Sequence, residues 1–503
     1  MRIRRLTALF LAAAAFAGAA RAEPVAYPKA SVSEAPGEET AVLNGETFVN
    51  HGLVAAARVP AANLDFLGDT LGSFSAMLIE PGSWQKTAEG YTARLRTLPD
   101  RGYNEPDKGF FSDYQGRLVD FDLSLKLDGK AGTLSVTPTG TGTPLTGFDG
   151  KPTTGADPAS HTMTENGHVL PSPAEGALGA GRLSLDAEGV ARRADGRIYV
   201  SDEYAADIYL FAADGRLEGI IDPSPAIVPM TDGRIDDNSL KAPDTGRRNN
   251  QGLEALSISP DGKTLFAVLQ SGAVQDSSAS KNQANRATTR VYVYDISADA
   301  LPKAPKAVYA LELPVYSKKG NGEIDATAAL SEMAALSDHQ FLLLTRDGNG
   351  WGCGCKNPEM VKQILVVDTA GATNLAGTDF ETTTKPIAPK VGERNVLDPA
   401  ITPVKSAVLV NMLNPVQLAR VGLNIDNEKA DAKTLSEKWE ALALAPARDP
   451  NAPNDVFLFV GNDNDFLTTK GVMQGKSYDA GLDNDSMVLA YRLTLPETVK
   501  LGW

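Results

Sequence analysis

The chain has 503 residues, 42% of them hydrophobic, so it can bury a large closed core, and a small scaffold held together by disulfides or metal is excluded. Its 46 Gly and 31 Pro predict many turns rather than long helices. A formal charge of −15 argues against nonspecific binding to nucleic acid or to an anionic membrane surface. An anionic substrate would therefore need a local cation to receive it.

Residues 1–22 have the pattern of a secretory signal. Arg2, Arg4 and Arg5 precede a short apolar run, and the sequence Ala-Arg-Ala ending at Ala22 fits the small-x-small rule for cleavage. No later segment is long and apolar enough to span a bilayer, so no stable membrane insertion is expected. We therefore expect a bacterial protein that is exported to the periplasm or the medium, with residues 23–503 as one mature domain.

One pattern recurs four times along the chain. Each copy has a glutamate that opens a short apolar strand, then a turn, a β-rich strand and a polar cluster. The copies begin near residues 185, 252, 330 and 438, and each is followed by a further strand, at residues 208–211, 291–294, 364–367 and 488–491. Asp195-Gly196 and Asp261-Gly262 provide hairpin turns in the first two copies. Residues 69–104 form a degenerate copy, in which Ser75 takes the place of the glutamate.

Repeated short strands with turn signals predict an all-β fold, a β-propeller. The glutamates are separated by 66, 78 and 108 residues, which is longer than the roughly 40–50 residues of a compact blade. Either the blades carry insertions or a blade without the glutamate lies between some of them. We expect six or seven four-stranded blades with loop insertions.

The repeated glutamates are candidate metal ligands. Equivalent residues of the innermost strands surround the central channel, so Glu188, Glu254, Glu332 and Glu440 would converge there. Carboxylates a few ångströms apart repel one another unless a cation compensates them. Hard oxygen ligands suit Ca²⁺ first, with Mn²⁺ or Mg²⁺ as alternatives. A purely structural alternative is that each glutamate accepts backbone N–H groups from the neighbouring blade.

Charged residues also recur just past the second strand of each copy. They are Asp100, Arg101, Asp202, Glu203, Arg346, Asp347 and Asp463. Arg101 and Arg346 would hold a phosphoryl or carboxylate group bidentately, with Asp100 and Asp347 beside them as catalytic candidates. Asp202, Glu203 and Asp463 would add metal ligands. The alternative is that these segments are simply polar turns.

Cys353 and Cys355 are the two cysteines, and in an oxidising compartment they predict a small local disulfide. Apart from the loose pair His161 and His168, the four histidines lack the spacing of metal ligands.

The repeated segments resemble the phytase-like family, also described as the esterase-like activity of phytase, a family of exported propellers. The resemblance lies in LPDRGYN at residues 98–104, DAEGVA at 186–191, VSDEY at 200–204, GLEALSISPDG at 252–262, SEMAAL at 331–336 and EALAL at 440–444. It implies hydrolysis of phosphoesters or esters. Long insertions near residues 140–180, 231–250 and 372–430 depart from the family pattern.

The leading hypothesis is thus an exported, divalent-metal-dependent phosphoesterase that acts as a monomer on a small-molecule phosphate ester. A propeller lactonase or carboxylesterase and a non-catalytic propeller that binds a ligand or partner are the alternatives.

Overall fold

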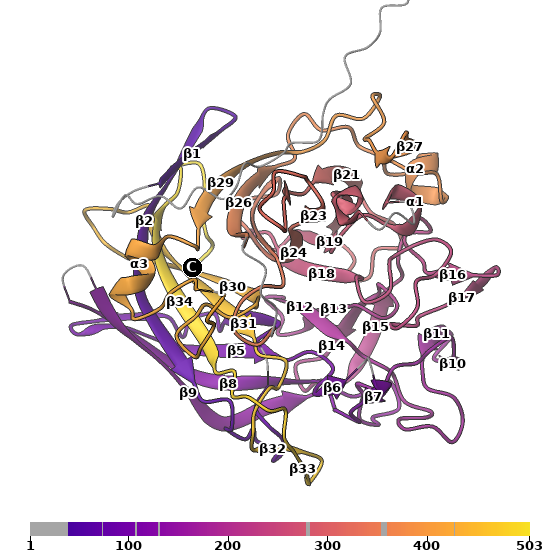
Figure 1. Ribbon diagram of the computed structural model, residues 1–503, viewed down its shortest axis with the longest axis horizontal. Coiled ribbons are helices and arrows are strands. Elements are labelled where there is room, and N and C mark those ends of the chain that lie inside the picture. The colour runs from indigo at the N-terminus through magenta and orange to yellow at the C-terminus, as the bar shows by residue number, and fades with distance from the viewer. Residues whose placement is uncertain are drawn as a thin grey trace, which may run out of the picture.

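A computed structural model describes residues 39–72, 74–105, 108–128, 131–277, 282–353, 360–426 and 428–503. The expected signal segment and its cleavage site lie outside these residues. Nearly all regular structure is β, and Figure 1 shows sheets arranged around a centre. Among the described residues, no helix is long and apolar enough to cross a membrane.

The sheets form a β-propeller, as predicted, with five blades where the sequence analysis expected six or seven. From the innermost strand outward, blade 1 contains β3 (Ala76–Ile79), β5 (Gly90–Leu98), β8 (Arg117–Asp128) and β9 (Ala131–Pro144), and β4 (Gln85–Thr87) pairs with β5. Blade 2 contains β12 (Ala187–Arg192), β13 (Ile198–Asp202), β14 (Ile208–Phe211) and β15 (Leu217–Ile221). Blade 3 contains β18 (Leu253–Ile258), β19 (Thr264–Leu269), β20 (Thr288–Asp295) and β21 (Ala307–Glu312).

Blade 4 contains β24 (Ala329–Ala335), β25 (Gln340–Arg346), β26 (Lys362–Asp368) and β29 (Lys405–Asn411). Blade 5 combines both ends of the described chain. It contains β30 (Lys438–Pro446), β31 (Asp455–Asp463) and β34 (Ser486–Thr494), followed by β2 (Glu46–Val59) and β1 (Glu39–Leu43). Because β2 pairs with β34, the ring is closed by backbone hydrogen bonds between distant parts of the sequence.

A separate apolar core fills each junction between neighbouring blades. The core between blades 4 and 5 is built around Trp439, and the core between blades 5 and 1 around Trp84. The other three junctions have cores of the same kind. This packing holds the five innermost strands, β3, β12, β18, β24 and β30, around a common axis.

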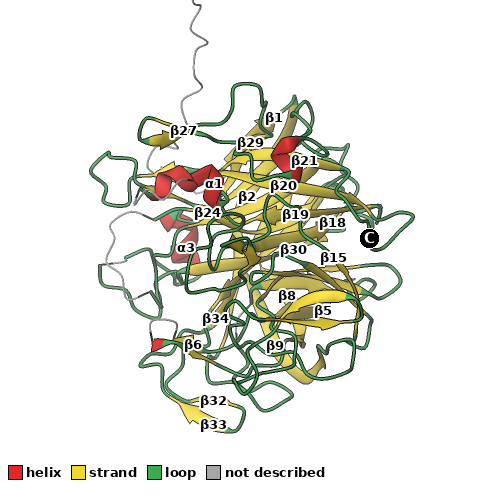
Figure 2. Ribbon diagram, turned by 90° about the vertical axis from the view of Figure 1, so that its right-hand side faces the viewer, coloured by secondary structure: helices red, strands yellow, loops and turns green. Residues whose placement is uncertain are grey.

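The long spacings between repeats are filled by insertions rather than by further blades. Small hairpins lie outside the five sheets: β6 (Asn104–Glu105) with β7 (Phe110–Phe111), β10 (Thr162–Glu165) with β11 (His168–Pro171), β16 (Met230–Thr231) with β17 (Arg234–Ile235), β22 (Val315–Tyr316) with β23 (Ala326–Thr327), β27 (Lys390–Val391) with β28 (Arg394–Asn395), and β32 (Gly471–Met473) with β33 (Lys476–Tyr478). The short helices are α1 (Val274–Ser277), the 3₁₀ turn Gln283–Arg286, α2 (Asp379–Thr382) and α3 (Pro415–Arg420). The expected insertion at residues 372–430 also supplies β29, the outer strand of blade 4. Figure 2 shows loops and hairpins at both ends of the strands.

Candidate metal and anion site

Three of the four repeated glutamates lie at a β-bulge on an innermost strand. The pairing of β12 with β13 skips from Ala187 to Val190, which leaves Glu188 in the bulge. In β18 and β30 the same irregularity leaves Glu254 and Glu440 out of register. A bulge bends the strand and redirects the side chain it carries. The repeat therefore aims carboxylates from blades 2, 3 and 5 toward one region.

Glu332 is the exception among the repeated glutamates. In β24 the irregular residue is Ser331, and Glu332 is in register with Leu344. Its Oε1 accepts the backbone N–H of Met333 at 2.7 Å and that of Leu256, in blade 3, at 3.1 Å. The structure thus gives Glu332 the backbone-binding role that the sequence analysis held open as the alternative.

Asp186, Glu188 and Glu203 form a cluster, which we call the Glu188 cluster. One carboxylate oxygen of each lies within 4.8 Å of the others, and all three side chains are buried. Glu203 follows β13 and is positioned by its backbone N–H, which donates to the carbonyl of Asp186 at 2.9 Å. Burial raises the pKa of Glu188 well above its usual value, and repulsion from Glu254, Glu203 and Asp186 adds to this.

One carboxylate oxygen in this cluster and one beside it have no hydrogen-bond partner among the described residues. Glu254 Oε2 and Asp186 Oδ1 are buried and accept no hydrogen bond from any described residue. Burial raises the pKa of Glu254 well above its usual value, with Glu203 and Glu440 contributing repulsion. Burial likewise raises the pKa of Glu203 to about 8. A buried carboxylate oxygen without a donor is costly, and the carboxylates of this region outnumber the arginines that face them, Arg101 and Arg346.

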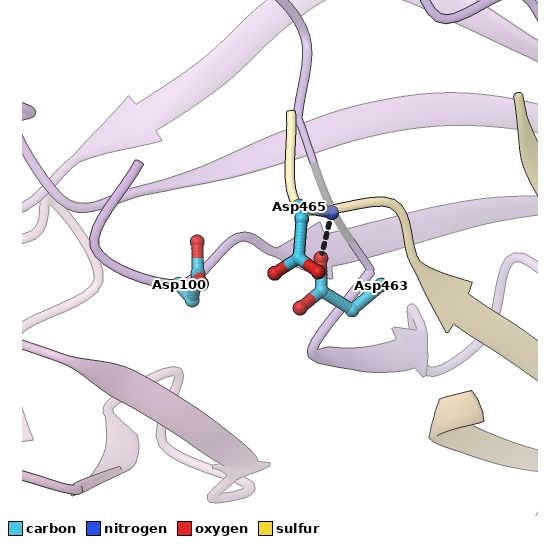
Figure 3. Close-up of side chains that lie close together, drawn as sticks. All are labelled: Asp100, Asp463 and Asp465. Carbon is cyan, nitrogen blue, oxygen red and sulfur yellow. Dashed lines mark hydrogen bonds between the residues drawn. The ribbon is translucent and has the colours of Figure 1, made fainter. Parts of the chain in front are cut away.

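A second cluster, the Asp463 cluster, consists of Asp100, Asp463 and Asp465. Figure 3 shows Asp100 facing the other two carboxylates, with the backbone N–H of Asp465 donating to Asp463 Oδ1 at 2.7 Å. Lys438 already supplies a cation here, since its Nζ pairs with Asp463 and lies 2.9 Å from Asp465 Oδ1. Burial alone would lower the pKa of Lys438, but these carboxylates raise it well above its usual value.

Two arginines lie among the carboxylates. Arg101 Nη1 donates to Asp186 Oδ2 at 2.7 Å, so Arg101 borders the Glu188 cluster. Arg346 pairs with Glu440, and its Nε donates to Ser331 Oγ at 3.1 Å. Both guanidinium groups are largely buried and are held in place by these contacts. The structure therefore brings both predicted arginines to the region of the glutamates.

Asp202 and Asp347 have local structural contacts instead. Asp202 accepts the backbone N–H of Asp186 at 2.9 Å and that of Ala205 at 2.6 Å, and burial raises its pKa to about 8. Asp347 accepts the backbone N–H of Asn349 at 2.8 Å and pairs with the buried Lys362 at 3.3 Å. Asp202 thereby fixes the turn that carries Glu203, and Asp347 fixes the strand end that carries Arg346.

Asp186, Lys438 and Asp465 belong to the site but were not among the predicted residues. Asp186 and Lys438 each lie two residues before a repeated glutamate, but the other two repeats have Gly252 and Leu330 there, so the repeat gives no signal at that position. Asp465 lies two residues after the predicted Asp463. Cys353 is disulfide-bonded, and Cys355 lies outside the described residues.

The Glu188 cluster fits a hard divalent cation. It offers oxygen ligands only, two nearby carboxylate oxygens lack partners, and one arginine is its closest cation. The Asp463 cluster fits less well because Lys438 occupies it. The residues present thus favour the Glu188 cluster over the Asp463 cluster as a metal site.

Comparisons with known proteins agree with this fold. The model of the phytase-like family, described as the esterase-like activity of phytase, matches residues 86–466. A protein of Arthroderma benhamiae named "Uncharacterized secreted protein" is 32% identical over 468 residues, which cover 84% of this chain and 88% of that protein. The comparisons do not support the predicted bacterial source.

Several solved structures are similar at low identity. A luciferin-regenerating enzyme is 10% identical with a TM-score of 0.26, covering 86% of this chain and 94% of its own. The PQQ-bound aldose sugar dehydrogenase of Streptomyces coelicolor is 11% identical with a TM-score of 0.23, covering 94% of this chain and 97% of its own. Virginiamycin B lyase of Staphylococcus aureus is 11% identical with a TM-score of 0.25, covering 80% of this chain and 99% of its own.

Proposed function

Since the chain belongs to the phytase-like family, we propose that it is a divalent-metal-dependent hydrolase that cleaves phosphate esters. The observation that carries this proposal is the Glu188 cluster, in which buried carboxylate oxygens without partners lie beside Arg101. Phosphoester hydrolysis needs a cation to bind the anion and to stabilise the charge that develops. A metal held by these carboxylates would add its positive charge to that of the two arginines.

Glu188, Glu203 and Glu254, together with Asp186, would hold the metal. All contribute carboxylate oxygens, which favours Ca²⁺, with Mn²⁺ and Mg²⁺ as the other candidates. When bound there, such an ion supplies Lewis acidity and lowers the pKa of a coordinated water.

The chain's own cations would orient the substrate. Arg346 is fixed on one side by Ser331 and on the other by Glu440, so its guanidinium is preorganised. Arg101 is fixed through Asp186. Preorganised donors stabilise developing charge without reorganising during the reaction. Glu332, Asp202 and Asp347 support the backbone in this proposal, and they do not bind substrate or metal.

The experiment measures hydrolysis of p-nitrophenyl phosphate by chelator-treated protein before and after calcium, manganese or magnesium is added. We expect activity only with the metal, and a loss of at least about 100-fold in Glu188→Gln and Glu254→Gln. Asp207→Asn is the matched control, because Asp207 is also a buried carboxyl with a raised pKa but belongs to neither cluster. Full activity of Glu188→Gln, or no hydrolysis with any of the three metals, would contradict the proposal.

Hydrolysis of carboxylic esters or lactones is a second candidate, favoured by the family's description as esterase-like. Activity on p-nitrophenyl acetate or a lactone without activity on phosphate esters would select it. Binding of such compounds without turnover would select the non-catalytic alternative.

We further propose that residues 1–22 are removed after Ala22 and that the mature protein is an exported monomer. Its relative in Arthroderma benhamiae carries the word "secreted" in its name, which supports export. The mass of the amino terminus of the purified exported protein tests the cleavage site.

A further inference from the structure

The guanidinium of Arg101 lies close to two aromatic rings. Its central carbon is 5.4 Å from the ring centroid of Phe111 and 5.8 Å from that of Tyr204. One of its nitrogens, Nη1, is used by Asp186, whereas Nε is buried and donates to no described residue. A buried donor without an acceptor is unfavourable, so this position is suited to an external acceptor.

The two rings differ in accessibility. Tyr204 is fully buried, and its hydroxyl donates to the carbonyl of Gly155 at 2.8 Å. Phe111 is partly exposed, and its neighbour Phe110 is 46% exposed. Sites that bind small molecules combine aromatic side chains with a few polar groups, and Phe111 and Arg101 supply one of each. An anion at Arg101 would therefore have Phe111 as its apolar neighbour.

Further aromatic residues pack beside the β6–β7 hairpin. The ring of Tyr103 stacks on that of Tyr478 with centroids 4.1 Å apart and an interplanar angle of 11°, and Phe110 lies 6.1 Å from Tyr103. These contacts join the β6–β7 hairpin to the β32–β33 hairpin, which lie near each other in Figures 1 and 2. Rigid aromatic side chains bind flat groups at low entropic cost.

The charge distribution restricts the rest of the substrate. Arg101, Arg346 and Lys438 are each paired with a carboxylate, and the surrounding clusters are acidic. A substrate with many phosphate groups would place several negative charges near these carboxylates. A single phosphoryl group avoids most of this repulsion.

We infer that Phe111 forms a subsite for the aromatic or flat apolar group of an ester that carries one phosphoryl group, whose oxygen is received at Arg101. This inference rests on the proposed function, since it specifies the substrate class of the same site. It distinguishes aryl phosphate monoesters from polyphosphorylated compounds.

The first test is binding, which does not depend on turnover. Phenylphosphonate and methylphosphonate carry the same anionic group and cannot be hydrolysed. Their affinities for the calcium-loaded full chain are measured by calorimetry. We expect Phe111→Ala to weaken phenylphosphonate binding by about 3- to 10-fold and to change methylphosphonate binding by less than about 2-fold.

Trp503→Ala is the control, because Trp503 is 44% exposed but lines a different cavity of about 270 Å³ with Leu256 and Met333. It should leave both affinities unchanged. Phe111→Leu keeps the apolar volume and replaces the alanine variant if that variant fails to fold. Three results would overturn the subsite. The wild type could bind the two phosphonates with equal affinity, Phe111→Ala could weaken the binding of both compounds equally, or neither compound could bind.

The second test compares hydrolysis of phenyl phosphate, glycerol 3-phosphate and inositol hexakisphosphate. The inference predicts the highest kcat/KM for phenyl phosphate, and a preference for inositol hexakisphosphate would overturn it. If no phosphate ester is hydrolysed but the phosphonate discrimination is found, the proposed function is wrong and the subsite stands.

Discussion

The metal-free protein should lose stability as the pH rises from 5.5 to 7.5. Burial raises the pKa of Asp202, Glu203 and Glu437 to about 8. In the unfolded chain these groups have pKa values near 4. Between the two pKa values the folded state holds protons that the unfolded state has released. The contribution of these groups to the free energy of unfolding is therefore fully present below about pH 4 and is lost as the pH approaches 8.

The magnitude follows from proton linkage. One such group changes the free energy of unfolding by about 1 kcal/mol per pH unit. About 4 kcal/mol per pH unit is the upper bound for all three, because Glu203 and Glu437 also interact with other acidic groups. Urea unfolding in the presence of EDTA, at half-unit steps of pH, measures this slope. Saturating calcium should reduce the slope by the share that Glu203 contributes, because a bound cation stabilises the ionised form of this proposed ligand.

Two results would refute this reasoning. One is a metal-free protein whose stability is constant or increases with pH over this range, since the buried carboxyls would then be ionised without cost. The other is a slope that calcium leaves unchanged, since the metal would then bind elsewhere.

Three further predictions concern single residues. Lys438→Gln removes the cation of the Asp463 cluster, so calorimetry should detect one more bound calcium per chain than in the wild type. Lys438→Arg keeps the positive charge and should not add a calcium. Gly252→Ala would place a Cβ 2.5 Å from the carbonyl oxygen of Glu203, so it should lower the free energy of unfolding by about 1–3 kcal/mol and weaken calcium binding. Gly348→Ala is the control, because its Cβ would meet open space, and it should do neither. Asp202→Asn loses one of two buried acceptors for backbone N–H groups, so urea unfolding should show a loss of about 1–3 kcal/mol.

Much of the fold could be read from the sequence because each blade repeats the same hairpin. The turns at Gly196 and Gly262 have positive φ angles of 91° and 74°, as their Asp-Gly sequences indicated. The four strands expected after the repeats are β14, β20, β26 and β34, the third strands of their blades. The number of blades was overestimated because inserted hairpins lengthen the spacing between repeats without adding a sheet.

The candidate site was harder to predict than the fold. The glutamates recur in sequence, but the bulge in β24 lies at Ser331 instead of at the glutamate, so Glu332 turns to backbone N–H groups. Pairing register is set by contacts between strands, which a single sequence does not reveal. The cation in the Asp463 cluster was missed for a similar reason, since Lys438 precedes the repeated residue and acquires its role only when β30 and β31 pair.

The most direct test of the account is a crystal structure of the calcium-loaded protein. We predict an ion coordinated by Glu188, Glu203 and Glu254 together with Asp186, with Lys438 still paired to Asp463. An ion bound only at the Asp463 cluster, or no ion in the presence of saturating calcium, would contradict it.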